Sequence, residues 1–319
     1  MLDTFVEKCP LPVFYSKENK IEYLRKLGEG ISEVYHIKFN NKDYAGKIYI
    51  NHDIDDILYE TNIAEKLKHT KQSMKTQGII FLDNDKIIIL MELLISNGDL
   101  YDYISKKNRW TACYYNKKFK SFQPTPKTSY LYFNKDENIH WCYELPKKQK
   151  MKIALSISKA IDELHSVGII HGDIKTNNMI LHYQPKKQII KLIDFGMSYF
   201  KESDKLVEIE VKTGTEGYRP PEQDNYMINE KTDIYAMGVT IIEMWNGEIW
   251  YDGQSFKESR KEVLRGLRKL EKINPELGEL LRKSINLDHK KRPSSKAFLK
   301  TLKQIYFNNG HICKSGTRG

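Results

Sequence analysis

Apolar and polar positions repeat with two different periods along the chain. Residues 21–50 alternate with a period of two, interrupted by a glycine turn and an Asn-Asn-Lys-Asp turn, which predicts three β-strands. Residues 78–93 predict two more strands around an Asp-Asn-Asp turn. Residues 55–69 and 151–168 instead repeat their apolar positions every three to four residues, which is typical of amphipathic helices. A β-rich part is therefore expected before a helical part.

The rest of the sequence extends the helical part. Residues 231–245 are mostly apolar and predict a buried helix, and two or three further helices are expected before residue 306. Residues 1–20 contain two prolines and predict an irregular lead-in, while residues 307–319 predict a flexible tail. There is no internal repeat, so the pattern predicts a single α+β domain over residues 21–306.

Composition narrows the class of protein. The 319 residues carry a formal net charge of +10 from lysines spread along the whole sequence, which we interpret as a solvated surface. The longest apolar run, residues 87–95, is too short to cross a bilayer and contains Glu92. The N-terminus has no apolar region of the kind found in signal peptides. We therefore expect a protein of the cytoplasm, with the nucleus as the alternative, and no membrane partner.

The cysteines point the same way. They show no Cys-x-x-Cys motif and no paired spacing, and they predict free thiols in a reducing compartment rather than a disulfide framework or a zinc site. The cysteines are Cys9, Cys113, Cys142 and Cys313.

Candidate chemistry is concentrated in residues 171–196, which read HGDIKTNNMIL, a polar turn, and IIKLIDFG. Two aspartates, Asp173 and Asp194, lie 21 positions apart with Asn178 between them, and oxygens of Asp and Asn suit a hard divalent cation, especially one that also holds phosphate oxygens. A second carboxylate that is not bound to metal can accept a hydroxyl proton, and Lys175 can neutralise charge on a phosphoryl group. These residue types predict phosphoryl transfer.

The same stretch resembles the catalytic loop and DFG pair of protein kinases, H-x-D-x-K-x-x-N followed by D-F-G. The resemblance covers residues 21–306. It implies a bilobal fold, with a small β-rich lobe over about residues 21–92 and a larger, mostly helical lobe over about residues 97–306. It also implies ATP as the phosphoryl donor, with Mg²⁺, or Mn²⁺ as the alternative. By resemblance, Asp173 and Lys175 are catalytic, and Asn178 and Asp194 hold metal.

The β-rich part resembles the nucleotide-binding half of the family. Ala45 and Lys47 lie on one face of the third predicted strand, and by resemblance Lys47 orients the α- and β-phosphates. The family pairs this lysine with a helix glutamate; Glu60 matches the family spacing better than Glu65. The resemblance places further nucleotide contacts at Leu27, Gly28, Gly30, Val34, Met91 (the gatekeeper), Glu92 and Leu94 (the hinge), and Asp99.

Two of these assignments have alternatives. The glycine loop departs from the family because Ser32 or Glu33 replaces its third glycine and the loop is one residue short before Val34, so the two glycines alone also fit a plain hairpin. Asp99 is expected to meet the ribose hydroxyls, or else to cap the helix that follows it.

The later sequence indicates the substrate type. KTGTEGYRPPEQ resembles the end of a kinase activation segment, with Pro220 in place of the usual alanine. Lys175 together with Thr215 resembles serine/threonine kinases, and Thr215 is expected to hydrogen-bond Asp173 and Lys175. Arg292 matches the family arginine that pairs with Glu222.

Gly172 is the main departure, because the family usually has an arginine there that pairs with a phosphate on the activation loop. We hypothesise an enzyme that does not need activation-loop phosphorylation. Acidic residues in the loop would also disfavour added negative charge: Glu202, Asp204, Glu208 and Glu210.

Alternatives remain at this point. The H-G-D motif also occurs in small-molecule phosphotransferases of the aminoglycoside and choline kinase type, and the altered glycine loop also fits a pseudokinase scaffold. A basic, aromatic-rich insert at residues 105–146 does not match the family, and its second half predicts a β-hairpin. Such an insert can pack on the domain, dock a protein or stack nucleic-acid bases. We expect protein substrates rather than nucleic acid as partners.

Overall fold

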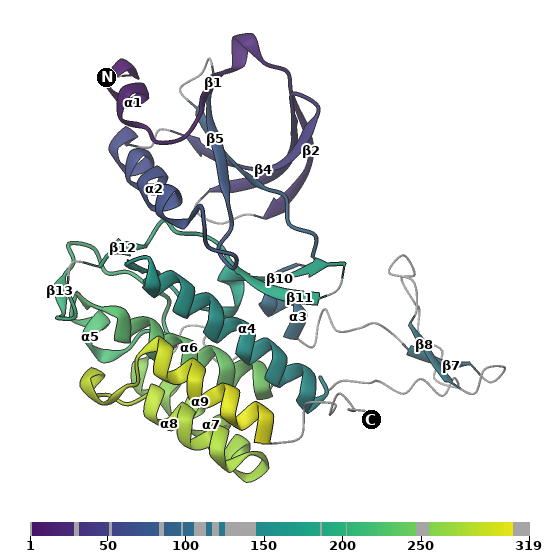
Figure 1. The fold of residues 1–319 in the computed structure, drawn as a ribbon, viewed down its shortest axis with the longest axis vertical. Helices are drawn as coiled ribbons and strands as arrows, with labels where there is room; N and C mark the ends of the chain where they lie inside the picture. Colours follow the sequence, from purple (N-terminus) through teal and green to yellow (C-terminus); the bar gives the residue numbers. More distant parts are fainter. Residues whose placement is uncertain are drawn as a thin grey trace, which may run out of the picture.

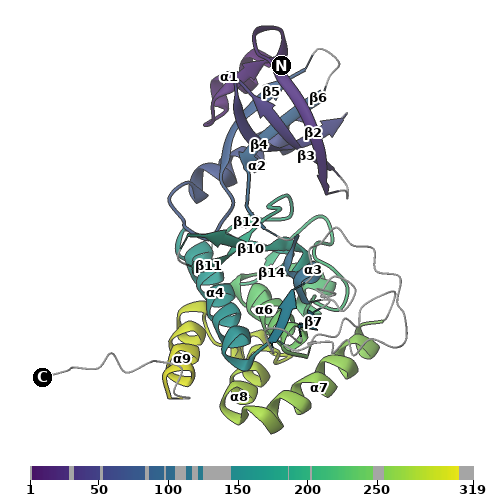
Figure 2. The same ribbon diagram turned by 90° about the vertical axis from the view of Figure 1, so that its right-hand side faces the viewer.

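The computed structural model has two lobes, a β-rich lobe and a helical lobe below it (Figure 1). It describes residues 2–28, 32–50, 53–82, 86–96, 98–104, 113–116, 121–124, 145–185, 187–201, 203–246 and 255–308. Figure 2 shows the same division from the side, with helices α7 (Phe256–Ile273) and α8 (Pro275–Ser284) at the end far from the sheet. The α+β bilobal arrangement expected from the sequence is confirmed.

One sheet forms the small lobe. Within the described residues it joins six strands in the order β1-β5-β6-β4-β3-β2, and only the β1–β5 pair is parallel. The strands are β1 (Val13–Tyr15), β2 (Ile21–Gly28), β3 (Glu33–Phe39), β4 (Lys42–Ile50), β5 (Thr76–Phe81) and β6 (Lys86–Glu92). Asn40 and Asn41, both with positive φ, make the tight β3–β4 turn, a conformation that asparagine tolerates. The strands predicted over residues 21–50 and 78–93 are confirmed.

Helix α2 (Ile54–Leu67) lies beside this sheet (Figure 1). It begins at Asp53, whose side chain accepts a hydrogen bond from the backbone N–H of Asp55. Ile57 is buried and belongs to an apolar cluster that it shares with side chains of the sheet. The helix predicted over residues 55–69 is therefore confirmed, and it shares an apolar cluster with the sheet.

The expectation of an irregular segment over residues 1–20 is wrong. Helix α1 (Leu2–Lys8) precedes β1, and the 3₁₀ turn Ser16–Glu18 follows it. Phe5 is buried, and its ring meets that of Phe81 edge to face at 5.4 Å. A three-residue strand that pairs with β5, far away in sequence, leaves no periodic signal of its own.

The large lobe is built on helix α6 (Glu230–Asn246), buried at every position from Thr232 to Trp245. This confirms the buried helix predicted over residues 231–245. The other helices are α3 (Leu100–Ile104), α4 (Lys147–Ser166), α5 (Pro221–Asp224) and α9 (Ser295–Asn308). Helix α9 extends through residues 307 and 308, which were predicted as part of a flexible tail; the rest of that tail lies outside the described residues.

The segments between the helices of the large lobe contain short strands. They are β9 (Ile169–Ile170), β10 (Met179–Gln184), β11 (Lys187–Leu192), β12 (Tyr199–Phe200), β13 (Val207–Glu208) and β14 (Met227–Ile228). In the insert, β7 (Cys113–Asn116) and β8 (Ser121–Pro124) form an antiparallel pair that the sequence did not predict. The hairpin predicted in the second half of the insert lies outside the described residues.

Candidate active site

The catalytic-loop aspartate lies within a closed set of polar contacts. Oδ1 of Asp173 accepts a hydrogen bond of 2.7 Å from the Thr215 hydroxyl, and Oδ2 lies 2.8 Å from Nζ of Lys175. Lys175 Nζ also donates to Thr215 Oγ1 at 2.7 Å. The Nδ2 of Asn178 donates to the carbonyl oxygen and to Oδ2 of Asp173, at 2.9 Å each. Side chains from separate segments of sequence therefore converge on one carboxylate.

Helix α6 fixes the shape of this loop. Asp233, in its first turn, is almost fully buried and accepts backbone N–H bonds from His171 at 2.8 Å and Gly172 at 3.0 Å. Oδ2 of Asp233 also lies 2.9 Å from Nε2 of His165. A buried carboxylate is stable only when its oxygens have such partners. Movement of the loop would break these bonds, so the core of the large lobe holds Asp173 in position.

A second polar cluster joins the two lobes. Nζ of Lys47 on β4 lies 3.2 Å from Oε1 of Glu60 on α2 and 3.3 Å from Oδ1 of Asp194. Glu65, the other acidic candidate on α2, instead pairs with Lys68. The ion pair expected between Lys47 and Glu60 is therefore present in the structure.

The charges of this second cluster stabilise one another. Desolvation lowers the pKa of Lys47, but the carboxylates of Glu60 and Asp194 raise it by more, so this pKa lies above its ordinary value. Partial desolvation raises the pKa of Asp194, but the adjacent Lys47 ammonium lowers it by more, so this pKa lies below its ordinary value. Lys47 is therefore a cation and Asp194 an anion at neutral pH.

Asp194 and Asn178 offer oxygen donors of the kind that Mg²⁺ prefers. The Asp194 side chain is 53% exposed, on a backbone with φ of 61°, in the left-handed region that Asp tolerates better than most residues. The NH₂ group of Asn178 donates to Asp173, so the side-chain oxygen of Asn178 can still serve as a metal ligand. No cluster of three or more His, Cys, Asp or Glu occurs among the described residues that could cage a metal. This donor set fits Mg²⁺ or Mn²⁺ that takes its other ligands from phosphate and water.

One face of the sheet carries three of the residues expected around the nucleotide. Val34 lies opposite Lys47 in the β3–β4 ladder, and Ala45 lies opposite Met91 in the β4–β6 ladder. Val34, Ala45 and Met91 belong to the same apolar cluster. They therefore form an apolar surface beside the Lys47 ammonium.

The glycine loop is described only at its ends. Leu27, 41% exposed, and Gly28 close β2, and a register shift separates Lys26 from Gly28. A Cβ built at Gly28 would meet no atom of the described residues within 4 Å, so packing among those residues does not require glycine there. Gly30 lies outside the described residues.

The connector between the lobes is anchored through Glu92. Its Oε1 lies 2.6 Å from Lys191 Nζ and accepts the backbone N–H of Lys75 at 2.9 Å. The Glu92 side chain therefore ties together the segments that contain Lys75 and Lys191. Leu94 follows in the irregular connector.

Asp99 makes the capping contact that was its alternative role. Its Oδ1 accepts the backbone N–H of Asp102 at 2.7 Å, at the start of α3, while Oδ2 accepts a bond of 3.1 Å from Asn177. Burial raises the pKa of Asp99 to about 6. Both carboxylate oxygens of Asp99 therefore accept hydrogen bonds from within the chain.

Sequence reasoning missed Tyr49. Its hydroxyl donates to Oε2 of Glu60, and Nζ of Lys47 lies 4.9 Å from the centre of its ring. The signal was available, because Ala45, Lys47 and Tyr49 follow one another at a spacing of two on the same strand face. Asn177, which contacts Asp99, was also missed and has no comparable signal.

The activation segment packs directly against Gly172. This glycine has φ of 79°, and a Cβ built on it would overlap the carbonyl oxygen of Met197 and lie 3.5 Å from Cδ1 of Ile228. Ile228 belongs to a small apolar cluster with Ile170 and Ile209, and Ile209 is 4% exposed. Apolar side chains therefore lie next to the position where the family has its arginine.

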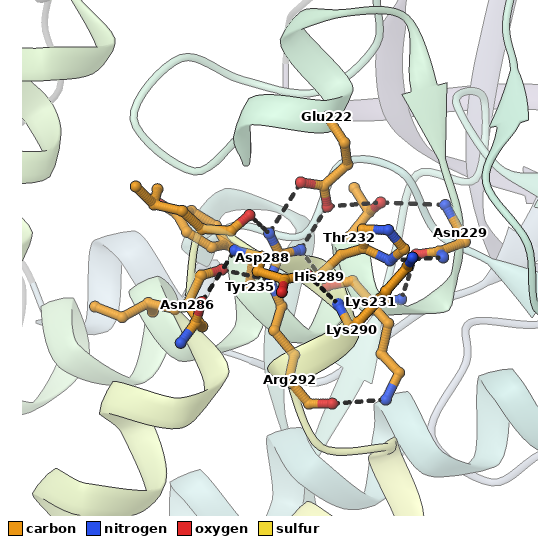
Figure 3. Close-up of polar contacts among 12 residues, drawn as sticks. Glu222, Asn229, Lys231, Thr232, Tyr235, Asn286, Asp288, His289, Lys290 and Arg292 are labelled. Atoms are coloured by element: carbon orange, nitrogen blue, oxygen red, sulfur yellow. Dashed lines mark hydrogen bonds and ion pairs between the residues drawn. The ribbon is translucent and has the colours of Figure 1, made fainter.

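The end of the activation segment is tied to the large lobe by Arg292 (Figure 3). Its guanidinium forms a two-pronged ion pair with the Glu222 carboxylate. It also donates to backbone carbonyls, including that of Asn286 at 2.7 Å, and lies 5.0 Å from the centre of the Tyr235 ring. Lys231 Nζ in turn donates to the carbonyl oxygen of Arg292 at 2.7 Å. The expected Glu222–Arg292 pair is thus present and almost fully buried.

Comparisons with known proteins agree with this geometry. A family model described as the protein kinase domain matches residues 21–306. The probable serine/threonine-protein kinase fnkE of Dictyostelium discoideum is 29% identical over 188 residues, covering 58% of this chain and 12% of that protein. Calcium-dependent protein kinase 29 of Arabidopsis thaliana is 25% identical over 266 residues, covering 80% of this chain and 42% of that protein. Serine/threonine-protein kinase kin-29 of Caenorhabditis briggsae is 34% identical over 136 residues, covering 42% of this chain and 16% of that protein.

The chain thus matches less than half the length of each of these relatives. Among the described residues, no helix combines the length and the apolar character needed to cross a membrane. The family match spans most of the chain and includes both polar clusters and the buried Glu222–Arg292 pair. The chain therefore belongs to the eukaryotic-type protein kinase family.

Proposed function

We propose that this chain transfers the γ-phosphoryl group of ATP to serine or threonine hydroxyls of protein substrates. The observation that carries the proposal is the network in which Thr215 donates to Asp173 and accepts from Lys175. This network brings together the Asp173 carboxylate, the Lys175 ammonium and the Thr215 hydroxyl. Phosphoryl transfer depends mainly on such positioning and electrostatics, because the transferring group needs little covalent help.

Each side chain has a defined task in this proposal. Asp173 orients the substrate hydroxyl and accepts its proton, and Lys175 neutralises charge on the γ-phosphoryl group. Lys47, held by Glu60, orients the α- and β-phosphates. Asp194 and Asn178 hold Mg²⁺, or Mn²⁺, which when bound supplies positive charge that offsets the charge on the phosphate oxygens. The proposed contacts to the rest of the nucleotide come from Leu27, Gly28, Gly30, Val34, Ala45, Met91, Glu92, Leu94 and Asp99.

Serine and threonine are the proposed acceptors because Thr215 and Lys175 contact each other and Asp173 directly. The matched relatives with printed specificity are serine/threonine kinases, which supports the same choice. The scattered cysteines support a place of action in the cytoplasm.

We further propose that activity does not require phosphorylation of the activation segment. In place of a phosphate anchor, Ile209 of the segment packs in one apolar cluster with Ile170 and Ile228, and Ile228 lies beside Gly172. The segment is also paired with the chain after α5, where Val207 lies opposite Ile228. Lys201 Nζ adds a contact of 3.0 Å to Glu230. These contacts hold the segment without any added charge.

Two hydroxyl groups of the activation segment also support activity without phosphorylation of that segment. Thr213 is buried and accepts a bond of 3.1 Å from Gln223, so a kinase could not reach it in this conformation. Ser203 is exposed, but the carboxylate of its neighbour Asp204 already pairs with Lys201 Nζ at 2.7 Å, so a phosphate on Ser203 would have to compete with Asp204 for this cation.

Two alternatives make different predictions. A pseudokinase scaffold would bind partners without transferring phosphate, and a small-molecule phosphotransferase would label a metabolite. The charge pairs of Lys47 and the intact Asp173 network favour a working kinase over a pseudokinase. The anchored segment ending at Glu222 favours a protein substrate over a small molecule.

One assay separates the three. Radiolabelled ATP is supplied with acidic and basic protein substrates, and wild type is compared with Asp194→Asn and Asp173→Ala. Label on serine or threonine of protein, reduced about 10²- to 10⁴-fold in the variants, supports the proposal. Label no higher in wild type than in the variants would favour a pseudokinase, and label only on small metabolites would favour the other alternative.

A further inference from the structure

Tyr49 lies at the contact between the sheet and helix α2. It is 7% exposed and packs in the same apolar cluster as Ile57 of α2. Its hydroxyl donates to Oε2 of Glu60, the carboxylate whose Oε1 lies 3.2 Å from Lys47. Tyr49 and Lys47 are two residues apart on one face of β4. Strand β4 therefore holds the Glu60 carboxylate at two points.

The contact of Lys47 with Glu60 differs in kind from that of Tyr49 with Glu60. Lys47 is shared between Glu60 and Asp194, so its ammonium is open to competition from other anions. Tyr49 is a neutral donor, and burial together with the Glu60 charge raises the pKa of its phenol. It therefore stays protonated and keeps donating over the whole neutral range. A hydrogen bond to an ionised acceptor is among the stronger ones in proteins.

This arrangement has a consequence for helix α2. When no nucleotide is bound, Lys47 can turn fully toward Asp194, and Glu60 then loses one of its two partners. The Tyr49 bond remains, because it depends on neither phosphate nor metal. Glu60 then stays where Lys47 can pair with it again.

We propose that Tyr49 is a positioning residue that holds Glu60, and with it helix α2, in place for Lys47 when no nucleotide is bound. The inference rests on the proposed function, since it assigns Tyr49 to the site that would orient ATP. Tyr49 acts through Glu60 and Lys47 and is not itself assigned a contact with substrate.

The test uses Tyr49→Phe, which keeps the ring and its packing and removes only the hydroxyl. Tyr44→Phe is the matched control, because Tyr44 lies on the same strand and packs in the cluster on the opposite face. Hydrogen exchange of the α2 amides is measured on the nucleotide-free full chain. We expect exchange over residues 54–67 to be about tenfold faster in Tyr49→Phe and within about twofold of wild type in Tyr44→Phe.

A second measurement separates positioning from general destabilisation. In steady-state kinetics, Tyr49→Phe is expected to raise KM for ATP about tenfold and to change kcat less than about threefold, because saturating nucleotide restores the site. In a Glu60→Ala background, the same Tyr49→Phe change should have no further effect on α2 exchange, since the acceptor is already gone.

The outcomes are distinct. Unchanged α2 exchange in Tyr49→Phe overturns the inference, whatever the kinetics show. An equal effect of Tyr49→Phe with and without the Glu60 carboxylate also overturns it, because the hydroxyl would then act elsewhere. A wild-type chain without phosphotransferase activity would contradict the proposed function, while the exchange measurement would still decide the role of Tyr49.

Discussion

The hydroxyl of Thr215 donates a hydrogen bond of 2.7 Å to Oδ1 of Asp173, which joins the activation segment to the catalytic loop. Replacing Thr215 by Val keeps the shape but removes the hydroxyl. We expect kcat to fall about 10²-fold, because small misplacements of a reacting group carry costs of this size. Thr215→Ser keeps the hydroxyl and should stay within about fivefold of wild type. Initial rates at saturating ATP provide the measurement, and equal rates for Val and wild type would contradict the role of this bond.

Gly172 and Gly168 provide a matched pair for the close approach of the activation segment. Both have positive φ, but a Cβ at Gly172 would overlap the Met197 carbonyl, whereas a Cβ at Gly168 would meet no atom of the described residues within 4 Å. Gly168→Ala should cost about 1 kcal/mol through backbone strain alone. Gly172→Ala should cost at least about 3 kcal/mol, because steric overlap adds to the same strain. Urea unfolding of both variants measures the difference, and equal costs would show that the segment does not pack on Gly172 in solution.

Ile209 is expected to replace a phosphate as the anchor of the activation segment. It is 4% exposed, while Val211, two residues later, is 69% exposed. Ile209→Ala should lower kcat about tenfold, because the segment loses its buried contact. Val211→Ala should remain within about twofold of wild type. Rates are measured on protein treated with phosphatase.

The phosphatase step tests the same claim directly. Wild-type activity should change by less than about twofold when the protein is dephosphorylated. A large loss of activity, regained after phosphorylation of Ser203 or Thr213, would contradict activity without loop phosphorylation.

Glu243 should give the protein an unusual dependence of stability on pH. It is fully buried in α6, and burial raises its pKa to about 8, although Tyr218 donates to its Oε2 at 2.6 Å. The folded state therefore binds a proton that the unfolded state releases between about pH 4.5 and 8. Stability contributed by this group is present at low pH and is lost as pH rises through that window.

Glu243→Gln removes this titration. The free energy of unfolding of wild type relative to Glu243→Gln should fall by about 1.4 kcal/mol per pH unit between about pH 5.5 and 7.5. Urea unfolding at three pH values measures the slope. A constant difference between the two proteins would show that Glu243 is ionised in the folded state throughout.

Local patterns predicted the parts of this fold that depend on neighbouring residues. Period-two alternation identified β2 to β4, an Asp-Asn-Asp turn between apolar runs identified β5 and β6, and apolar spacing identified α2 and α4. Helix α6 was identified by its mostly apolar sequence. Strand β1 was missed, since its three residues are ordered by pairing with β5. The pair β7–β8 was also missed, because strands of four residues are too short to show a clear alternation.

The site was predictable only where a motif names the residue. The expected neighbours Lys47 and Glu60 are in contact, and Thr215 meets Asp173. Tyr49 was missed because no motif requires it, although its strand face was known. The burial of Ile209 could not have been found from sequence, because it comes from packing with Ile170 and Ile228, which are distant in the chain. Gly172 indicated a missing arginine but not what takes its place.

Phosphoamino-acid analysis of labelled protein tests the central claim most directly. Wild type and Asp173→Asn are incubated with radiolabelled ATP, Mg²⁺ and a protein substrate, and the labelled protein is hydrolysed. We predict label on phosphoserine or phosphothreonine in wild type, and at least about 10²-fold less in Asp173→Asn, which keeps the shape of the side chain but cannot accept the proton in the same way. Label on tyrosine alone, or equal labelling by both proteins, would contradict the account.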